Sequence, residues 1–248
     1  MLISIKIFFA FINFYQIKNI PWNILAIQIA LIGPNSLSII LITSFFMGMV
    51  LSLQIVKELL YLNAVYLIGS VLTISFLREL SPVLTLVIFI GRVGSCFTSE
   101  LATMKVTEQI DALYLLGTNP ISYLVLPRII SCIVILPVLN LFAFTTSLFG
   151  SAFICLFLYN IDPSVFFLSS LSSLYLIDIL KSSIKTIIFG FCIAIISCAW
   201  GLSTNGGSQE VGLCTTSSVV VSLLSVFMLD FILSYFMFNQ FDPTLNII

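Results

Sequence analysis

Charged residues interrupt an apolar segment of this chain between Gly91 and Pro120. Arg92 and Glu100 lie inside the segment, and a short polar-capped helix is expected to follow over Thr107–Leu116. A charged side chain is costly inside lipid and is usually kept there for function. A short amphipathic helix between two membrane-spanning segments is a natural docking surface. The segment GRVGSCFTSELATMKVTEQIDALYLLGTNP therefore carries the most functional information in the sequence.

Capping signals delimit the short helix. Thr107 is its expected N-cap, Gly117 fits the position just past its C-terminus, and Pro120 prevents continuation. Glu108 and Asp111 fall in the first turn, where negative charge suits the helix dipole. Apolar residues at three-residue spacing form one face of the helix: Ile110, Leu113 and Leu116.

The composition is that of a membrane protein. The chain has 248 residues, of which 60% are hydrophobic and only 8% charged, whereas soluble domains average about 25% charged residues. A membrane-spanning helix needs roughly 20 apolar residues. Segments without a charged residue reach or approach that length at 19–56, 59–77, 129–161, 186–209 and 211–229. The alternating pattern of membrane-spanning strands is missing. The sequence predicts an all-α polytopic membrane protein.

Several function classes are excluded by composition and motifs. A net charge of −1 without a basic cluster argues against a nucleic-acid partner. The chain has no histidine, and its six cysteines lack metal-binding spacing, so no metal and no cofactor is expected. Phosphate-loop, serine-hydrolase and zinc-protease motifs are missing. The chain is therefore expected to have no catalytic residues and to be no enzyme.

The apolar segments give a provisional order of elements. Pro21 and Pro34 are expected to interrupt an N-terminal region, 1–33, that suits a helix lying in the membrane interface. One transmembrane domain follows over 34–248, with Asp162–Lys185 as a Ser-rich connection. Spans are expected at 36–56, at 82–104 with a break around Gly91, Arg92 and Gly94, and at 120–159, 186–203 and 216–238.

Segment 59–77 leaves the topology open. If it does not cross the membrane, the chain has five spans and loop 105–128 lies on the same side as the N-terminus, with lysines and arginines divided four against four. If it crosses, the division is five against three and the loop lies on the opposite side. The positive-inside rule mildly favours the second arrangement. The resemblance described below favours the first.

The charged residues within the membrane also allow more than one interpretation. Arg92 could pair with a carboxylate such as Glu79 or Glu100, or could meet substrate directly. The pair Arg78-Glu79 could cap a helix or line a headgroup site. Small residues around Arg92 could serve packing within one chain or an interface between two copies: Gly91, Gly94 and Ser95.

The central motif resembles the MlaE (YrbE) family of lipid ABC transporter permeases. The similarity runs through R-E-L-S-P-V-L, G-R-V-G-S-C-F-T-S-E-L-A-T-M-K-V-T-E-Q-I-D-A-L, G-T-N-P and P-R, and ends in D-F-I-L-S-Y-F-M-F at Asp230–Phe238. It covers nearly the whole chain from about residue 30. The resemblance implies an MlaE-type permease domain with an interfacial N-terminal helix, about five transmembrane helices and a short coupling helix.

The resemblance also implies partners and a position for the short helix. It implies a homodimer, a separate ABC ATPase subunit, an MCE-domain lipid-binding protein on the far side, and membrane lipid as the substrate. The short helix would be the coupling helix seated on the ATPase, which requires loop 105–128 on the N-terminal side. The implied coupling residues are Glu108, Gln109, Ile110, Asp111, Leu113 and Leu116.

Family positions further imply a lipid cavity. Leu51, Leu59, Leu62 and Glu79 match cavity-lining positions, and Arg78 would stand beside a headgroup. Glu58 falls where the family can have an apolar residue, so its role is not assigned.

The expected function is transport of phospholipid or glycolipid precursors across or between envelope membranes. The expected location is the plastid inner envelope, with a bacterial inner membrane as the alternative. A competing hypothesis is a membrane subunit of a twin-arginine type protein translocase, and a passive scaffold is a third class.

Overall fold

The computed structural model describes residues 22–204 and 206–238. The expected interfacial helix within residues 1–33 therefore lies largely outside the described residues. The described part of the chain consists of helices joined by short turns, with no strand. Five of its helical runs are long and apolar enough to cross a membrane. The predicted all-α membrane fold is confirmed.

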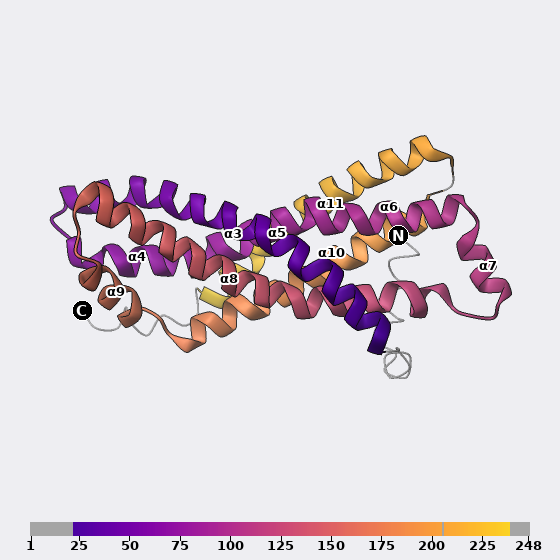
Figure 1. Cartoon of the computed structure of the whole chain (residues 1–248), viewed down its shortest axis with the longest axis horizontal. Helices are drawn as coiled ribbons and strands as arrows, with labels where there is room; N and C mark the ends of the chain where they lie inside the picture. The colour runs from indigo at the N-terminus through magenta and orange to yellow at the C-terminus, as the bar shows by residue number, and fades with distance from the viewer. Residues whose placement is uncertain (1–21, 205, 239–248) are drawn as a thin grey trace. The chain divides into compact units, whose positions relative to one another are not determined.

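Three of the five runs are single α-helices (Figure 1), and the other two contain turns of a different helical pitch. The first is α3 (Trp22–Tyr61), the fourth α10 (Leu176–Leu202) and the fifth α11 (Ser208–Phe238). The second run consists of η1 (Val65–Leu67), α4 (Ile68–Ser75), η2 (Phe76–Leu80), α5 (Ser81–Phe89), η3 (Ile90–Gly94) and α6 (Ser95–Val106). The third consists of η4 (Ile121–Val125) and α8 (Leu126–Tyr159). Two short helices connect the runs: α7 (Gln109–Leu115) and α9 (Pro163–Ser172).

The second run explains segment 59–77. Its first residues end α3, and the remainder begins the 42-residue helical run Val65–Val106, so it is not a separate span. The expected break at 91–94 is also absent, because η3 carries the helix through the glycines. If each of the five runs crosses once, α7 lies on the same side as the start of α3. This parity agrees with the five-span arrangement.

Pro34 does not end a helix, contrary to the expected break. It lies inside α3, which continues unbroken for 40 residues. A proline removes one helical hydrogen bond. A buried stripe with a four-residue repeat runs past it and holds the two halves in one helix: Ile32, Ser36, Ile40, Ser44, Gly48, Ser52 and Val56.

The connection expected over 162–185 is also helical. Asp162 precedes α9, which has Pro163 in its first turn, and α10 already begins at Leu176. Proline suits the first turn of a helix because its missing N–H needs no partner there. Five of the seven serines of this segment bond to carbonyls three or four residues back, as in Ser183 Oγ to the Ile179 carbonyl at 2.9 Å, so they do not interrupt the helices.

The described chain divides into two compact units, and each of the five long helical runs contributes residues to both. The first unit contains Leu86–Leu136, Ile187–Leu229 and the described residues up to Ser36. The second contains Leu37–Thr85, Pro137–Thr186 and the described residues from Asp230 onward. In the second unit α4 packs against α9 (Figure 1). Its apolar core consists of Val56, Ile68, Leu72, Phe76, Leu77, Phe144, Cys155, Ile161 and Phe166.

In the second unit, α3 and α8 approach through their backbones. A Cβ atom built on Gly48 would lie 2.2 Å from the Ser147 carbonyl oxygen, and one on Gly150 would lie 2.3 Å from that of Phe45. The hydroxyls of Ser44 and Thr146 lie 2.5 Å apart in the same contact. Small residues permit this approach in membrane helices, where packing rather than the hydrophobic effect drives association.

We predict that Gly48→Ala destabilises the protein, since the added methyl group must push the two backbones apart. The expected cost is about 1–3 kcal/mol, the usual range for overpacking. The melting temperature in detergent measures it. Gly212→Ala is the matched control, because a Cβ atom there meets nothing within 4 Å. Equal melting temperatures for the two variants would contradict the close contact.

Candidate functional site: the short helix and the buried charges

The helix α7 begins two residues later than the sequence predicted. Thr107 is not its N-cap: its hydroxyl donates back to the Thr103 carbonyl at 2.8 Å and so belongs to the end of α6. Glu108 takes the N-cap position with φ +58°, in the left-handed region, and makes no side-chain capping bond. The side-chain pattern pointed to Thr107 because Ser and Thr hydroxyls bond backward as readily as forward.

The end of α7 agrees with the prediction. Gly117 has φ +72°. Its N–H donates to the Tyr114 carbonyl at 3.0 Å, and the Thr118 N–H donates to the Leu113 carbonyl at 3.2 Å. These two bonds form a Schellman motif, in which a glycine after the helix satisfies the last carbonyls. Gly117 therefore ends the helix as expected.

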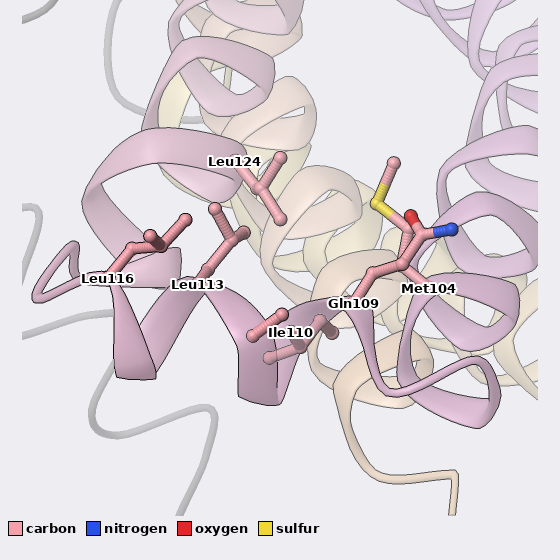
Figure 2. A pocket seen from close by; sticks show the side chains of 7 residues that line it. Met104, Gln109, Ile110, Leu113, Leu116 and Leu124 are labelled. Carbon is pink, nitrogen blue, oxygen red and sulfur yellow. The ribbon is translucent and has the colours of Figure 1, made fainter.

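The apolar face of α7 is directed mostly into the protein. Ile110 is only 3% exposed. A hollow of about 230 Å³ lies beside the helix. Figure 2 shows Ile110 and Leu113 with Leu124 of η4 along its lining, and Met104 of α6 and Gln109 at its other side. Ile110 therefore anchors α7 to the neighbouring helices, and its side chain is buried rather than presented on the surface.

The outer surface of α7 has a different apolar group. Leu115 is 90% exposed and Leu116 is 76% exposed, beside the exposed Tyr114. The three-residue spacing selected Leu116 but missed the two residues before it, because they fall off the stripe through Ile110. Three consecutive large apolar residues before a glycine were the available signal.

Two ion pairs hold the hairpin that carries α7. Lys105 binds both carboxylate oxygens of Asp111, at 2.9 and 3.1 Å, on the exposed surface. The buried Arg128 donates to Glu100 at 2.7 Å, and its guanidinium lies 5.2 Å from the centre of the Phe97 ring. The second pair joins α6 to α8, so the helical runs before and after α7 are linked to each other. Arg128 was missed because the sequence placed it in a loop.

Arg92 does not form the ion pair that the sequence suggested. Glu100 pairs with Arg128, and Glu79 pairs with Lys185. The Arg92 guanidinium instead donates to the Asn35 carbonyl of α3 through Nη1. It reaches this carbonyl from η3, inside the first unit.

Arg78 and Glu79 lie in η2, which is a π-helical turn and so is wider than an α-helical one. Both side chains join a buried charge network in the second unit. Arg78 Nη2 lies 3.3 Å from Asp178 Oδ2. The Lys185 ammonium, which is fully buried, lies 3.1 Å from Glu79 Oε2 and 2.7 Å from Asp230 Oδ1. The interpretation of Arg78-Glu79 as a helix cap does not hold, since both side chains pair with other helices.

The backbone carbonyl of Arg78 is also part of this network. Pro82, four residues later, has no N–H to donate to it. Lys185 Nζ donates to that carbonyl at 3.2 Å and to Ser234 Oγ at 2.8 Å. Asn140 adds a second polar contact, because Ser81 Oγ donates to its Oδ1 and its Nδ2 donates to Ser182 Oγ at 2.8 Å. Buried charges in lipid persist when they are paired in this way.

The predicted cavity leucines lie in the same unit as Arg78 and Glu79. Leu51 and Leu59 are half-buried against the apolar core, whereas Leu62, in the turn after α3, is 74% exposed. Among the described residues, no three His, Cys, Asp or Glu side chains gather as a metal site.

Long apolar helices, a short helix between two of them and paired charges that link them are the features of a polytopic membrane protein. A family model for the permease MlaE matches residues 25–236. The probable ABC transporter permease protein ycf63 of Pyropia yezoensis is 49% identical over 236 residues, which cover 95% of this chain and 90% of that protein. The probable ABC transporter permease protein slr1045 of Synechocystis is 47% identical over 217 residues, covering 88% and 82%.

A further relative is the Arabidopsis thaliana protein TRIGALACTOSYLDIACYLGLYCEROL 1, chloroplastic. It is 43% identical over 227 residues, which cover 92% of this chain and 65% of that protein. This chain belongs to the MlaE permease family. The resemblance drawn from the central motif is confirmed, and these matches do not favour a translocase subunit.

We predict that Lys185→Met destabilises the protein, because Glu79 and Asp230 lose the buried cation between them. Removing one partner of a buried pair costs about 3–5 kcal/mol. The melting temperature in detergent and the yield of folded protein measure this loss. The triple variant Glu79→Gln, Lys185→Met, Asp230→Asn should recover much of the stability. A single variant as stable as the wild type would contradict the network.

Proposed function

We propose that this chain is the transmembrane subunit of an ABC transporter for phospholipid or glycolipid precursors, driven by a separate ATPase bound at α7. The observation that carries the proposal is α7 itself, an external helix anchored inward by Ile110 with apolar residues left on its outer side. Family membership supports it. The name of the Arabidopsis relative supports a lipid substrate and a plastid location, with a bacterial inner membrane as the alternative.

The geometry suggests how α7 transmits work. Tyr114, Leu115 and Leu116 offer a compact apolar contact at the end of the helix, and Glu108 and Asp111 supply charge beside it. Ile110 and Leu113 connect this contact to α6 and η4 through the shared hollow. A push on the outer residues therefore passes into two membrane-spanning runs. The ATPase would bias which of two permease states is populated.

The lipid route is proposed from the second unit. Arg78 and Glu79 would face a headgroup, and Leu51, Leu59 and Leu62 would line the space for acyl chains. A homodimer would place two such surfaces around one cavity, and an MCE-domain protein would exchange lipid with it. The charge network supports this role because it holds polar groups inside apolar helices at a fixed position.

We predict that Leu115→Asp abolishes ATPase binding, since a carboxylate would be buried in an apolar contact. The expected fall in co-purified ATPase is at least about tenfold, equivalent to about 1.4 kcal/mol. Leu115→Met is the matched control and should bind normally. The melting temperature of both variants should equal that of the wild type, because residue 115 is exposed. Normal ATPase binding by Leu115→Asp would remove α7 as the coupling site.

We also predict that lipid alters ATP hydrolysis by the assembled transporter. The permease and its ATPase, reconstituted in liposomes, should hydrolyse ATP at a rate that changes at least about twofold with substrate lipid, because a ligand shifts a two-state equilibrium through its differential affinity. Charge reversal at both Glu108 and Asp111 should remove this response. Hydrolysis that is indifferent to every envelope lipid would contradict lipid transport and leave the ATPase contact standing.

A further inference from the structure

A hollow with polar groups in its lining lies in the first unit, formed by different residues from the apolar hollow beside α7 and from the Arg78 network. It has a volume of about 230 Å³ between the first half of α3, η3 and α6. Gln28 and Asn35 contribute polar groups from α3, and Arg92 contributes the only cation of its lining. We call it the Arg92 pocket.

Arg92 has one recorded partner among the described residues, the Asn35 carbonyl. A guanidinium has five N–H donors and a permanent positive charge. A backbone carbonyl leaves that charge uncompensated. Residues 80–91 and 93–99 of the same run carry no charge, so Arg92 stands inside an apolar membrane-spanning stretch where an unpaired charge is costly.

Glu100, the only carboxylate lining the pocket, is committed elsewhere. Its Oε2 accepts from the buried Arg128 at 2.7 Å, and its Oε1 lies 3.2 Å from the Cys96 thiol. The other ion pair recorded in this unit joins Lys105 to Asp111. Arg92 therefore lacks an anionic partner within the described chain, and its pocket is open to receive one.

The walls of the pocket favour a ligand with an apolar part. Leu31 is 56% exposed on its α3 side, and Val93 and Phe97 line its α6 side. The planar fork of arginine matches the paired oxygens of phosphate or sulfonate. From these features we propose that the Arg92 pocket binds the anionic headgroup of a membrane lipid, with an acyl chain along Leu31 and Phe97.

This inference does not depend on the proposed transport route. A lipid held at Arg92 would be a resident or regulatory lipid of the permease, distinct from a lipid at Arg78 and Glu79. The two proposals are separable. A variant could lose lipid binding at Arg92 and still transport lipid, or it could lose transport and still bind lipid at Arg92.

Native mass spectrometry of the complete transporter in detergent tests the site. The probes are dioleoyl phosphatidylglycerol, an uncharged dioleoyl galactolipid and inorganic phosphate. Phosphatidylglycerol should occupy the wild type selectively, and Arg92→Gln should raise the concentration for half-occupancy at least about tenfold, as expected for a lost charge-assisted bidentate contact. The concentration for half-occupancy of Arg92→Lys should lie between those of the wild type and Arg92→Gln. Lys57→Gln removes the same charge from an exposed position on α3 and should bind as the wild type does.

A second measurement needs no variant. Cys96 is exposed and lines the pocket, whereas Cys214 lies outside it and is partly exposed. Phosphatidylglycerol should slow maleimide modification of Cys96 and leave Cys214 unchanged, and the galactolipid should protect neither. Equal binding by Arg92→Gln, equal binding of the galactolipid, or equal protection by inorganic phosphate would each overturn the proposal. Dissociation of a dimer by Arg92→Gln with unchanged lipid binding would assign Arg92 to a second copy of the chain.

Discussion

Charge inside lipid is the constraint on which this structure depends. A membrane-spanning helix can keep an ionised side chain only if another group satisfies it. Here three cations meet carboxylates from other helices: Arg78 with Asp178, Lys185 with Glu79 and Asp230, and Arg128 with Glu100. Each ion pair joins helices at fixed positions along their lengths. The same interactions that make the charges tolerable therefore also set how the helices pack within each unit.

Wide helical turns place these charges. Arg78 and Glu79 lie in η2, and Arg92 lies in η3. Turns of this kind are frequent at functional sites because they re-aim side chains and release carbonyls. Two of them end two residues before a proline, η2 before Pro82 and η4 before Pro127. The wider turn relieves the clash between the proline ring and the carbonyl four residues back.

The sequence predicted well what depends on composition and local signals. The helical membrane fold, the five spans, the end of α7 at Gly117 and the family all follow from apolar length, glycine chemistry or the central motif. The predictions failed where residues distant in the sequence determine the local structure. Pro34 and the 162–185 connection stay helical because of packing. The carboxylates expected to pair with Arg92 pair with Arg128 and Lys185 instead. Charge partners a hundred residues apart leave no local pattern. The exposed Leu115 was missed because a three-residue spacing describes the buried face.

The two ends of α7 have a consequence for assembly. Glu108 and Gly117 both hold left-handed backbone conformations, with φ of +58° and +72°. For Glu108 this geometry costs roughly 1–2 kcal/mol, and it bends the chain sharply on entry as the glycine does on exit. The helix is thus fixed in orientation before any companion arrives. If the proposed ATPase docks on it, little conformational entropy would be lost on ordering the contact, and more of the interaction free energy would remain for mechanical coupling.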